Sequence, residues 1–178
     1  SNFILSEMRS RGAGFDEVLK EAQAKGYAEA DPTFDIEGID AAHKLTILSA
    51  IAFGVPPQFE KAYTEGISAL TEKDIKYAEQ LGYRIKLLGI TRRAKDGIEL
   101  RVHPTLIPGK RLIANVEGVM NAVLVKGDAV GATLYYGRGA GAAADVQSGR
   151  LGSGFDDEGL RRWGPAEREA GPLRRRER

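Results

Sequence analysis

Residues 84–102, RIKLLGITRRAKDGIELRV, contain the pattern that decides the fold class. Two runs rich in aliphatic residues flank Lys95-Asp96-Gly97, and an Asp-Gly pair between such runs favours a β-hairpin. A second pair of apolar runs flanks the turn at residues 126–128 in the same way. The sequence therefore predicts two successive hairpins, with strands over residues 84–91, 98–102, 119–125 and 129–136.

The residues that precede these hairpins have helical periodicity. Residues 15–25 carry apolar side chains at helical spacing and end at Gly26, which favours a helix stop. A turn at residues 31–33 precedes a longer helix over residues 37–53, and Thr71 begins a third helix that runs to Leu81. Helices followed by hairpins indicate an α+β fold, in which helices pack on one face of a mixed, antiparallel-rich sheet.

Composition narrows the classes of protein that this chain can belong to. The 178 residues include 26 Lys and Arg against 25 Asp and Glu, so a general nucleic-acid or acidic-membrane binder is not expected. The sequence has no cysteine, which excludes disulfides and thiolate chemistry, and no apolar run is long enough to cross a membrane. We expect a cytoplasmic protein.

The C-terminal stretch differs in composition from the rest. Residues 143–178 contain no lysine and only four branched aliphatic residues, so we expect a domain over residues 1–142 and a disordered, Arg/Gly-rich tail. The run Arg174-Arg175-Arg176 leaves open a basic interaction arm. The same composition is also what translation of a shifted reading frame in GC-rich DNA would produce, in which case the tail is not native.

The chemically richest stretch runs from Gly26 to Lys44. Asp40 and Lys44 are four residues apart, so on a helix they share one face, and that face continues to Ile47 and Ile51. We therefore expect the pair on a stripe that ends in the core, where a partly buried lysine beside a carboxylate is suited to proton transfer. Glu29 and Asp35 precede this helix and are candidates to bind a substrate cation.

Plainer interpretations of the same residues remain open. An Asp–Lys pair at this spacing is more often a surface ion pair worth ~0.3–0.5 kcal/mol. His43 and His103 are the only histidines and have no partners at metal-ligand spacing, so no metal site is expected. The glycines of residues 137–141 follow a strand but form GxGxG, which departs from the dinucleotide-binding pattern and also suits a simple tight turn.

Four segments resemble homoserine dehydrogenase in their order along the chain. The longest, residues 27–45, is similar to the signature of that family. The others are Asn2-Phe3-Ile4-Leu5, the stretch Val102-His103-Pro104-Thr105-Leu106-Ile107-Pro108, and Tyr136-Gly137-Arg138-Gly139-Ala140-Gly141. Together the resemblance covers residues 1–142.

The resemblance implies an activity and assigns roles to residues. The family interconverts aspartate semialdehyde and homoserine by hydride transfer with NADPH or NADH, in threonine, methionine and isoleucine synthesis. Lys44 matches the lysine taken as proton donor, and Asp40 matches the acid beside it. Glu29 and Asp35 match acids of the substrate pocket, while Gly139 and Gly141 match backbone near the cofactor. A homodimer formed through the sheet is also implied.

The sequence departs from the family pattern at both ends. The nucleotide-binding domain of the family is not seen before Ser1, and its Pro-Thr-Ala segment is not seen after the glycine loop. We therefore expect a catalytic and dimerisation region that is inactive by itself. The alternative is a non-catalytic dimeric domain that binds an amino acid or another partner.

Overall fold

The computed structural model describes residues 1–139, which contain a three-stranded mixed sheet. Strands β2 and β3 pair antiparallel along their whole lengths, from Tyr83 opposite Pro108 to Ala94 opposite Gly97, and short β1 pairs parallel to β3. The strand order is β1-β3-β2, so the expected mixed, antiparallel-rich sheet is confirmed. The strands are β1 (Tyr63–Thr64), β2 (Tyr83–Ala94), β3 (Gly97–Pro108), β4 (Met120–Gly127) and β5 (Gly131–Arg138).

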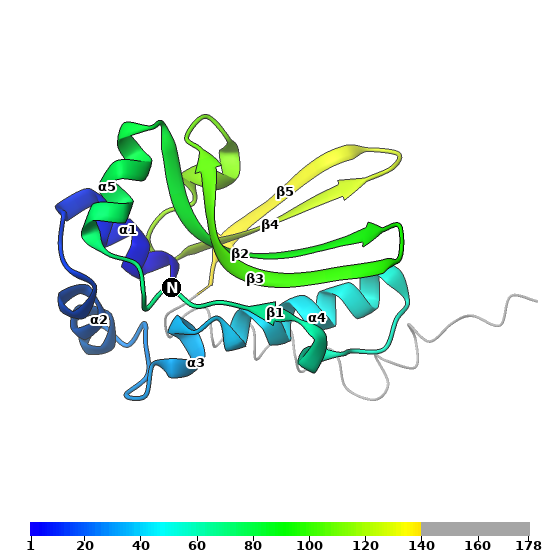
Figure 1. Ribbon diagram of the computed structural model, residues 1–178, viewed down its shortest axis with the longest axis horizontal. Helices are drawn as coiled ribbons and strands as arrows, with labels where there is room; N and C mark the ends of the chain where they lie inside the picture. Colours follow the sequence, from blue (N-terminus) through cyan, green and yellow to red (C-terminus); the bar gives the residue numbers. More distant parts are fainter. Residues whose placement is uncertain (140–178) are drawn as a thin grey trace, which may run out of the picture. The chain divides into compact units, whose positions relative to one another are not determined.

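Helices cover one face of this sheet (Figure 1). Helix α4 lies along the β2–β3 hairpin, where its Ala42 and Leu45 pack on Val102. The side chain of Leu45 lies directly over Gly89, which leaves room for it. The helices are α1 (Asn2–Arg11), α2 (Phe15–Ala24), α3 (Thr33–Ile36), α4 (Ile39–Phe53) and α5 (Glu72–Gln80), with short 3-10 turns η1 (Phe59–Lys61) and η2 (Leu112–Asn115).

A second, larger core joins α1, α2 and α5 at one end of the sheet (Figure 1). Ile85 and Leu87 alternate with Lys86 along β2, so they face this core while Lys86 faces the opposite side. Helix α1, which the sequence analysis does not predict, contributes fully buried side chains to the centre of this core. The core is built on Ile4, Leu5, Met8, Ala13, Val18, Ala22, Ile67 and Ile75.

The predicted helix that begins after Thr71 is confirmed together with its cap. The Thr71 hydroxyl accepts a hydrogen bond from the Asp74 N–H, and the Asp74 carboxylate accepts one from the Thr71 N–H at 2.9 Å. These two bonds satisfy N–H groups that the first helical turn leaves unpaired. A hydrogen bond from the Thr71 hydroxyl to the Asp74 carboxylate, at 2.6 Å, is the main reason that the pKa of Asp74 is lowered.

The second predicted hairpin is present but forms a sheet of its own. Strands β4 and β5 pair antiparallel from Met120 opposite Arg138 to Gly127 opposite Gly131, and they make no ladder with β2 or β3. In Figure 1 this hairpin lies on the side of β2 and β3 away from α4. The two hairpins therefore belong to separate sheets.

Other expectations differ in detail from the structure. The helix expected over residues 37–53 begins at Ile39, and residues 33–36 form the short α3 directly after the expected turn. Among residues 1–139, no helix is both long and apolar enough to cross a membrane. The tail expected over residues 143–178 lies outside the described residues.

Candidate functional site

The Asp40–Lys44 pair lies on the first turns of α4. Gly38 precedes the helix with a φ of 77°, a conformation that favours glycine, and Asp40 occupies the first turn, where a carboxylate is favourable. The Lys44 Nζ donates a hydrogen bond to the Asp40 Oδ2 at 2.7 Å. The sequence prediction that these two groups meet is confirmed.

The expectation that this stripe ends in the core is wrong for the described part of the chain. The Lys44 side chain is 70% exposed, and Ile47 and Ile51 are 56% and 77% exposed. The reason is the helical repeat: Ala42, Leu45, Thr46 and Ser49 are the residues of α4 that are buried, and the stripe from Asp40 to Ile51 lies half a turn away from them. Lys44 is therefore open to a ligand.

Asp35 lies close to this pair, on α3. Helices α3 and α4 pack against each other, and Asp35, Asp40 and Lys44 each lie within electrostatic range of the Ser1 nitrogen, so all three lie in one region of the surface. We call Asp35, Asp40 and Lys44 the site cluster; it combines two acids that can hold a cation with one ammonium that can give a proton.

Glu29 is placed less closely by the structure. It is exposed in the loop between α2 and α3, where its carbonyl accepts a hydrogen bond from the Gln23 amide at 3.0 Å. Within residues 1–139 its carboxylate makes no hydrogen bond or ion pair. The structure thus fixes the backbone of Glu29 but leaves its side chain unassigned.

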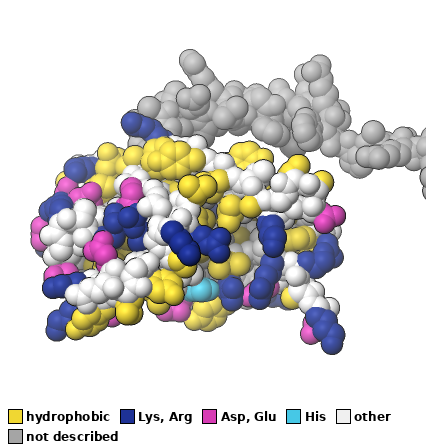
Figure 2. Space-filling view, turned by 90° about the horizontal axis from the view of Figure 1, so that it is seen from above, with side chains coloured by type: hydrophobic (Ala, Val, Ile, Leu, Met, Phe, Trp, Pro, Cys, Tyr) yellow, Lys and Arg dark blue, Asp and Glu magenta, His cyan; other side chains and the backbone are white. Residues whose placement is uncertain are grey.

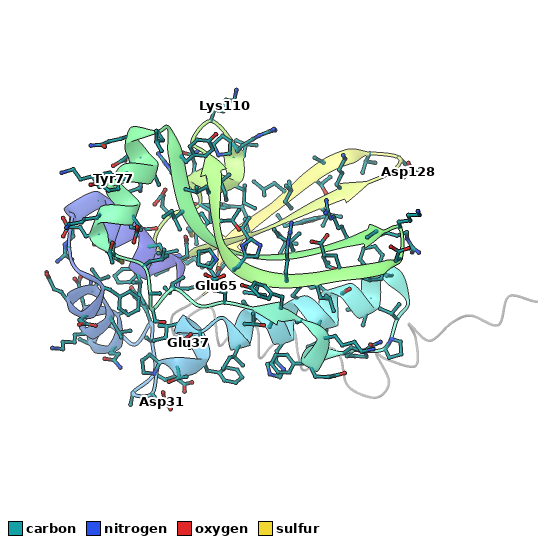
Figure 3. The ribbon with its side chains drawn as sticks, in the orientation of Figure 1. Asp31, Glu37, Glu65, Tyr77, Lys110 and Asp128 are labelled. Atoms are coloured by element: carbon teal, nitrogen blue, oxygen red, sulfur yellow. The ribbon has the colours of Figure 1, made fainter. Side chains whose placement is uncertain are left out.

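The segment between β1 and α5, residues 65–71, fixes the start of α4, and we call it the strap. The Glu65 N–H donates to the Val102 carbonyl at 2.8 Å, and the Ile67 N–H donates to the Ile36 carbonyl at 2.7 Å. Gly66 lies between these two bonds, against the backbone of Glu37. Figure 3 labels Glu37 and Glu65, which mark the two sides of this contact. The strap therefore joins β3 to the segment that carries the site cluster.

Of the two predicted cofactor residues, only Gly139 is described. It follows β5, and its N–H donates to the Val119 carbonyl at 3.1 Å. A Cβ at Gly139 would lie 1.3 Å from the side-chain nitrogen of Asn121, so the lack of a side chain allows the chain to pass over that residue. Gly141 lies outside the described residues.

The two histidines have structural contacts. His43 is stacked between Phe34 and Phe59, with ring centroids 5.5 and 3.9 Å away, and His103 makes its contacts to Pro104 and Thr105. Across residues 1–139 no group of three or more His, Asp or Glu side chains is arranged to hold a metal ion.

The sequence analysis missed Lys86, the one charged residue that is buried among residues 1–139. It is 6% exposed and hydrogen-bonds to Asn2 and to the Val116 carbonyl. Burial lowers the pKa of Lys86, and the nearby Glu117 opposes that effect. The sequence did contain one sign of it, because Lys86 is the single charged residue in the run Ile85-Lys86-Leu87-Leu88. A charged residue at such a position in a strand usually lies on the exposed face of the sheet.

Residues 1–147 match the family model of homoserine dehydrogenase. The chain belongs to the homoserine dehydrogenase family. Homoserine dehydrogenase from Pseudomonas aeruginosa is 75% identical over 140 residues, and that from Neisseria gonorrhoeae is 72% identical over 142 residues. These matches cover 79% and 80% of this chain but 32% and 33% of the relatives. The chain thus spans about a third of the length of the curated relatives it matches.

Solved structures of homoserine dehydrogenases also resemble this fold. The crystal structure of the enzyme from Thiobacillus denitrificans is 74% identical with a TM-score of 0.77, covering 86% of this chain and 38% of that one. A hyperthermophilic archaeal homoserine dehydrogenase mutant in complex with NADPH is 28% identical with a TM-score of 0.60, covering 85% of this chain and 44% of that one. The α+β fold is therefore that of homoserine dehydrogenases.

Proposed function

We propose that residues 1–142 are the substrate-binding part of an NAD(P)-dependent homoserine dehydrogenase. The whole enzyme would interconvert L-aspartate 4-semialdehyde and L-homoserine. It would act in the cytoplasm, in threonine, methionine and isoleucine biosynthesis. The observation that carries the proposal is the site cluster: an ammonium held 2.7 Å from a carboxylate on an exposed face of α4, with a second carboxylate on the adjacent α3. The family membership of residues 1–147 supports the same assignment.

The charges of the cluster suit this reaction. Reduction of the aldehyde leaves negative charge on its oxygen, and the Lys44 ammonium can give that oxygen a proton; in the reverse direction, neutral Lys44 takes the hydroxyl proton. Asp40 holds the Lys44 side chain on the first turns of α4. Asp35, and Glu29 once its side chain turns inward, provide negative charge for the α-ammonium group of the amino acid.

The cofactor would supply or accept the hydride. The described part of the chain provides few groups that could bind it. Gly139 is exposed, so its backbone is accessible to a bound ring. The other groups that hold a dinucleotide would have to come from outside residues 1–139. We therefore expect the 178-residue chain alone to show no turnover.

A chimaeric enzyme tests the proposal directly. Residues 1–139 replace the matching segment of the Pseudomonas aeruginosa homoserine dehydrogenase, and homoserine oxidation is followed by the absorbance of the reduced cofactor. Because the two segments are 75% identical, we expect a kcat within about tenfold of the relative's own. The same exchange with the segment from Neisseria gonorrhoeae serves as control. An active control beside a folded but inactive chimaera would contradict the proposal.

We also propose that the chain forms a homodimer through the β4–β5 sheet. A two-stranded sheet is only marginally stable by itself, yet both of its faces carry exposed apolar side chains. In Figure 2, which looks down from above on this side of the molecule, hydrophobic side chains lie among Lys and Arg. The large exposed apolar residues of the two strands are Val123, Leu124, Val125, Tyr135 and Tyr136.

The mass of the chain in solution checks this second proposal. Sedimentation equilibrium at tens of micromolar should give the mass of a dimer, and Leu124→Lys should give a monomer because it places a charge in the interface. Val130→Lys, in the turn between the two strands, should leave the dimer intact. A monomeric parent chain, or a dimer that is indifferent to Leu124→Lys, would rule out this interface.

A further inference from the structure

Lys86 is buried on the face of β2 opposite Ile85 and Leu87, which pack into the larger core. Its Nζ donates to the Asn2 Oδ1 at 3.0 Å and to the Val116 carbonyl, and lies 3.7 Å from the Glu117 carboxylate. Two hydrogen bonds and one ion pair therefore partner the ammonium group, although it is removed from water.

The surroundings make this burial costly. Arg9 and Arg84 each lie 2.9 Å from the same Glu117 carboxylate, so three cations share one anion. Removing an ammonium from water costs several kcal/mol even after relaxation, and well-packed apolar residues often replace a buried ion pair without loss of stability. The presence of a lysine therefore points to something that its hydrogen bonds hold in place.

The group that Lys86 holds is the side chain of Asn2. While the Asn2 Oδ1 accepts from Lys86, its Nδ2 donates to the carbonyls of Gly118 at 3.2 Å and Met120 at 2.8 Å. Both ends of the amide are thus used, which fixes one orientation of the side chain. The first residue of α1 is in this way pinned to the start of β4 and to the middle of β2.

Asn2 lies between this buried network and the site cluster. A cavity of about 90 Å³ has Ser1, Asn2, Lys86 and Asn121 among its lining residues. Ser1, the residue that precedes Asn2, lies within electrostatic range of all three residues of the site cluster. A change in the position of Asn2 would therefore move the wall of the cavity and the backbone that borders the site cluster.

We propose that Lys86 is a positioning residue: through Asn2 it fixes the Ser1–Asn2 segment against the site cluster and so sets the geometry of the substrate site. This inference rests on the proposed function. It assigns no contact with substrate to Lys86. A displacement of about 1 Å in groups that border a reacting substrate can lower a rate by about a hundredfold, so the expected effect is measurable.

The test uses the chimaeric enzyme with Lys86→Met, with Asn2→Ala and, as control, with Lys110→Met on the exposed loop after β3. Kinetics are measured with homoserine varied and then with the cofactor varied, at a temperature where circular dichroism shows each variant folded. We expect Lys86→Met and Asn2→Ala to raise the KM for homoserine about tenfold or more, with the cofactor KM changed less than twofold. Lys110→Met should change neither constant.

The outcomes separate this inference from the proposed function. An inactive parent chimaera would overturn the proposed function and this inference with it. An active parent with unchanged homoserine KM in both variants would overturn the inference alone, as would a loss of thermal stability without a change in KM. If Lys86→Met does not fold, Asn2→Ala decides: a raised homoserine KM supports the positioning role, and an unchanged one overturns it.

Discussion

Replacing Lys44 by alanine in the chimaeric enzyme should lower kcat by about 10²–10⁴, the usual contribution of a positioned general acid or base. The substitution removes the ammonium that lies 2.7 Å from Asp40 and leaves the oxygen of the substrate without a proton donor. Because the Lys44 side chain is 70% exposed, the free energy of unfolding should change little. Steady-state kinetics with saturating homoserine measure the effect.

The controls for this prediction concern charge and location. Lys110→Ala removes a lysine from the loop labelled at the top of Figure 3, on the other side of the sheet from α4, and should leave kcat unchanged. The cofactor KM should also be the same in the Lys44 variant, since Lys44 is assigned to the substrate. A Lys44→Ala enzyme with normal kcat and weakened cofactor binding would give this residue a different role.

Replacing Gly66 by alanine should destabilise the chain by about 3 kcal/mol or more, at the upper end of what an inserted methyl group costs in a packed region. The added Cβ would lie 2.5 Å from both the Glu37 Cα and the Ile36 carbonyl oxygen. These are backbone atoms, so no side chain can rotate away to make room. Either the strap or the segment before α4 has to move.

Thermal unfolding of the 178-residue chain measures this effect, and a fall in Tm of roughly 10 °C is expected. Gly14→Ala is the matched control: nothing lies within 4 Å of a Cβ there, and its φ of −70° suits any residue. The control should change the free energy of unfolding by less than about 0.5 kcal/mol. Equal Tm values for the two variants would contradict the prediction, because they would show that the strap can move aside at little cost in free energy.

Much of the secondary structure was predictable because its signals are local. The cap formed by Thr71 and Asp74, the Asp-Gly turn before β3 and the spacing of Asp40 and Lys44 each depend on residues a few positions apart. What escaped depends on distant partners. The burial of Lys86 depends on Asn2 and Val116, and the separation of the two sheets depends on ladders that no local pattern encodes.

The exposed face of α4 is a second feature that the sequence did not predict correctly. An apolar stripe through Ile47 and Ile51 is ordinarily a sign of burial, and the sequence analysis treats it so. The helix instead buries a narrow row of smaller side chains, including Ala42 and Ser49, against the sheet. Which of two apolar faces a helix turns toward a sheet depends on the shape of that sheet, and the spacing of residues along the helix does not contain this information.

The hydrogen bonds of Val119 and Met120 have a consequence for how this region can be joined to other polypeptide. The Asn2 side chain donates to the Met120 carbonyl and the Gly139 N–H donates to the Val119 carbonyl, so the second and last described residues meet at adjacent peptide groups. A polypeptide joined to Ser1 and one joined to Gly139 would therefore connect to this region at neighbouring positions. The region can therefore be exchanged as a cassette, with two neighbouring splice points and no rerouting of the scaffold around it.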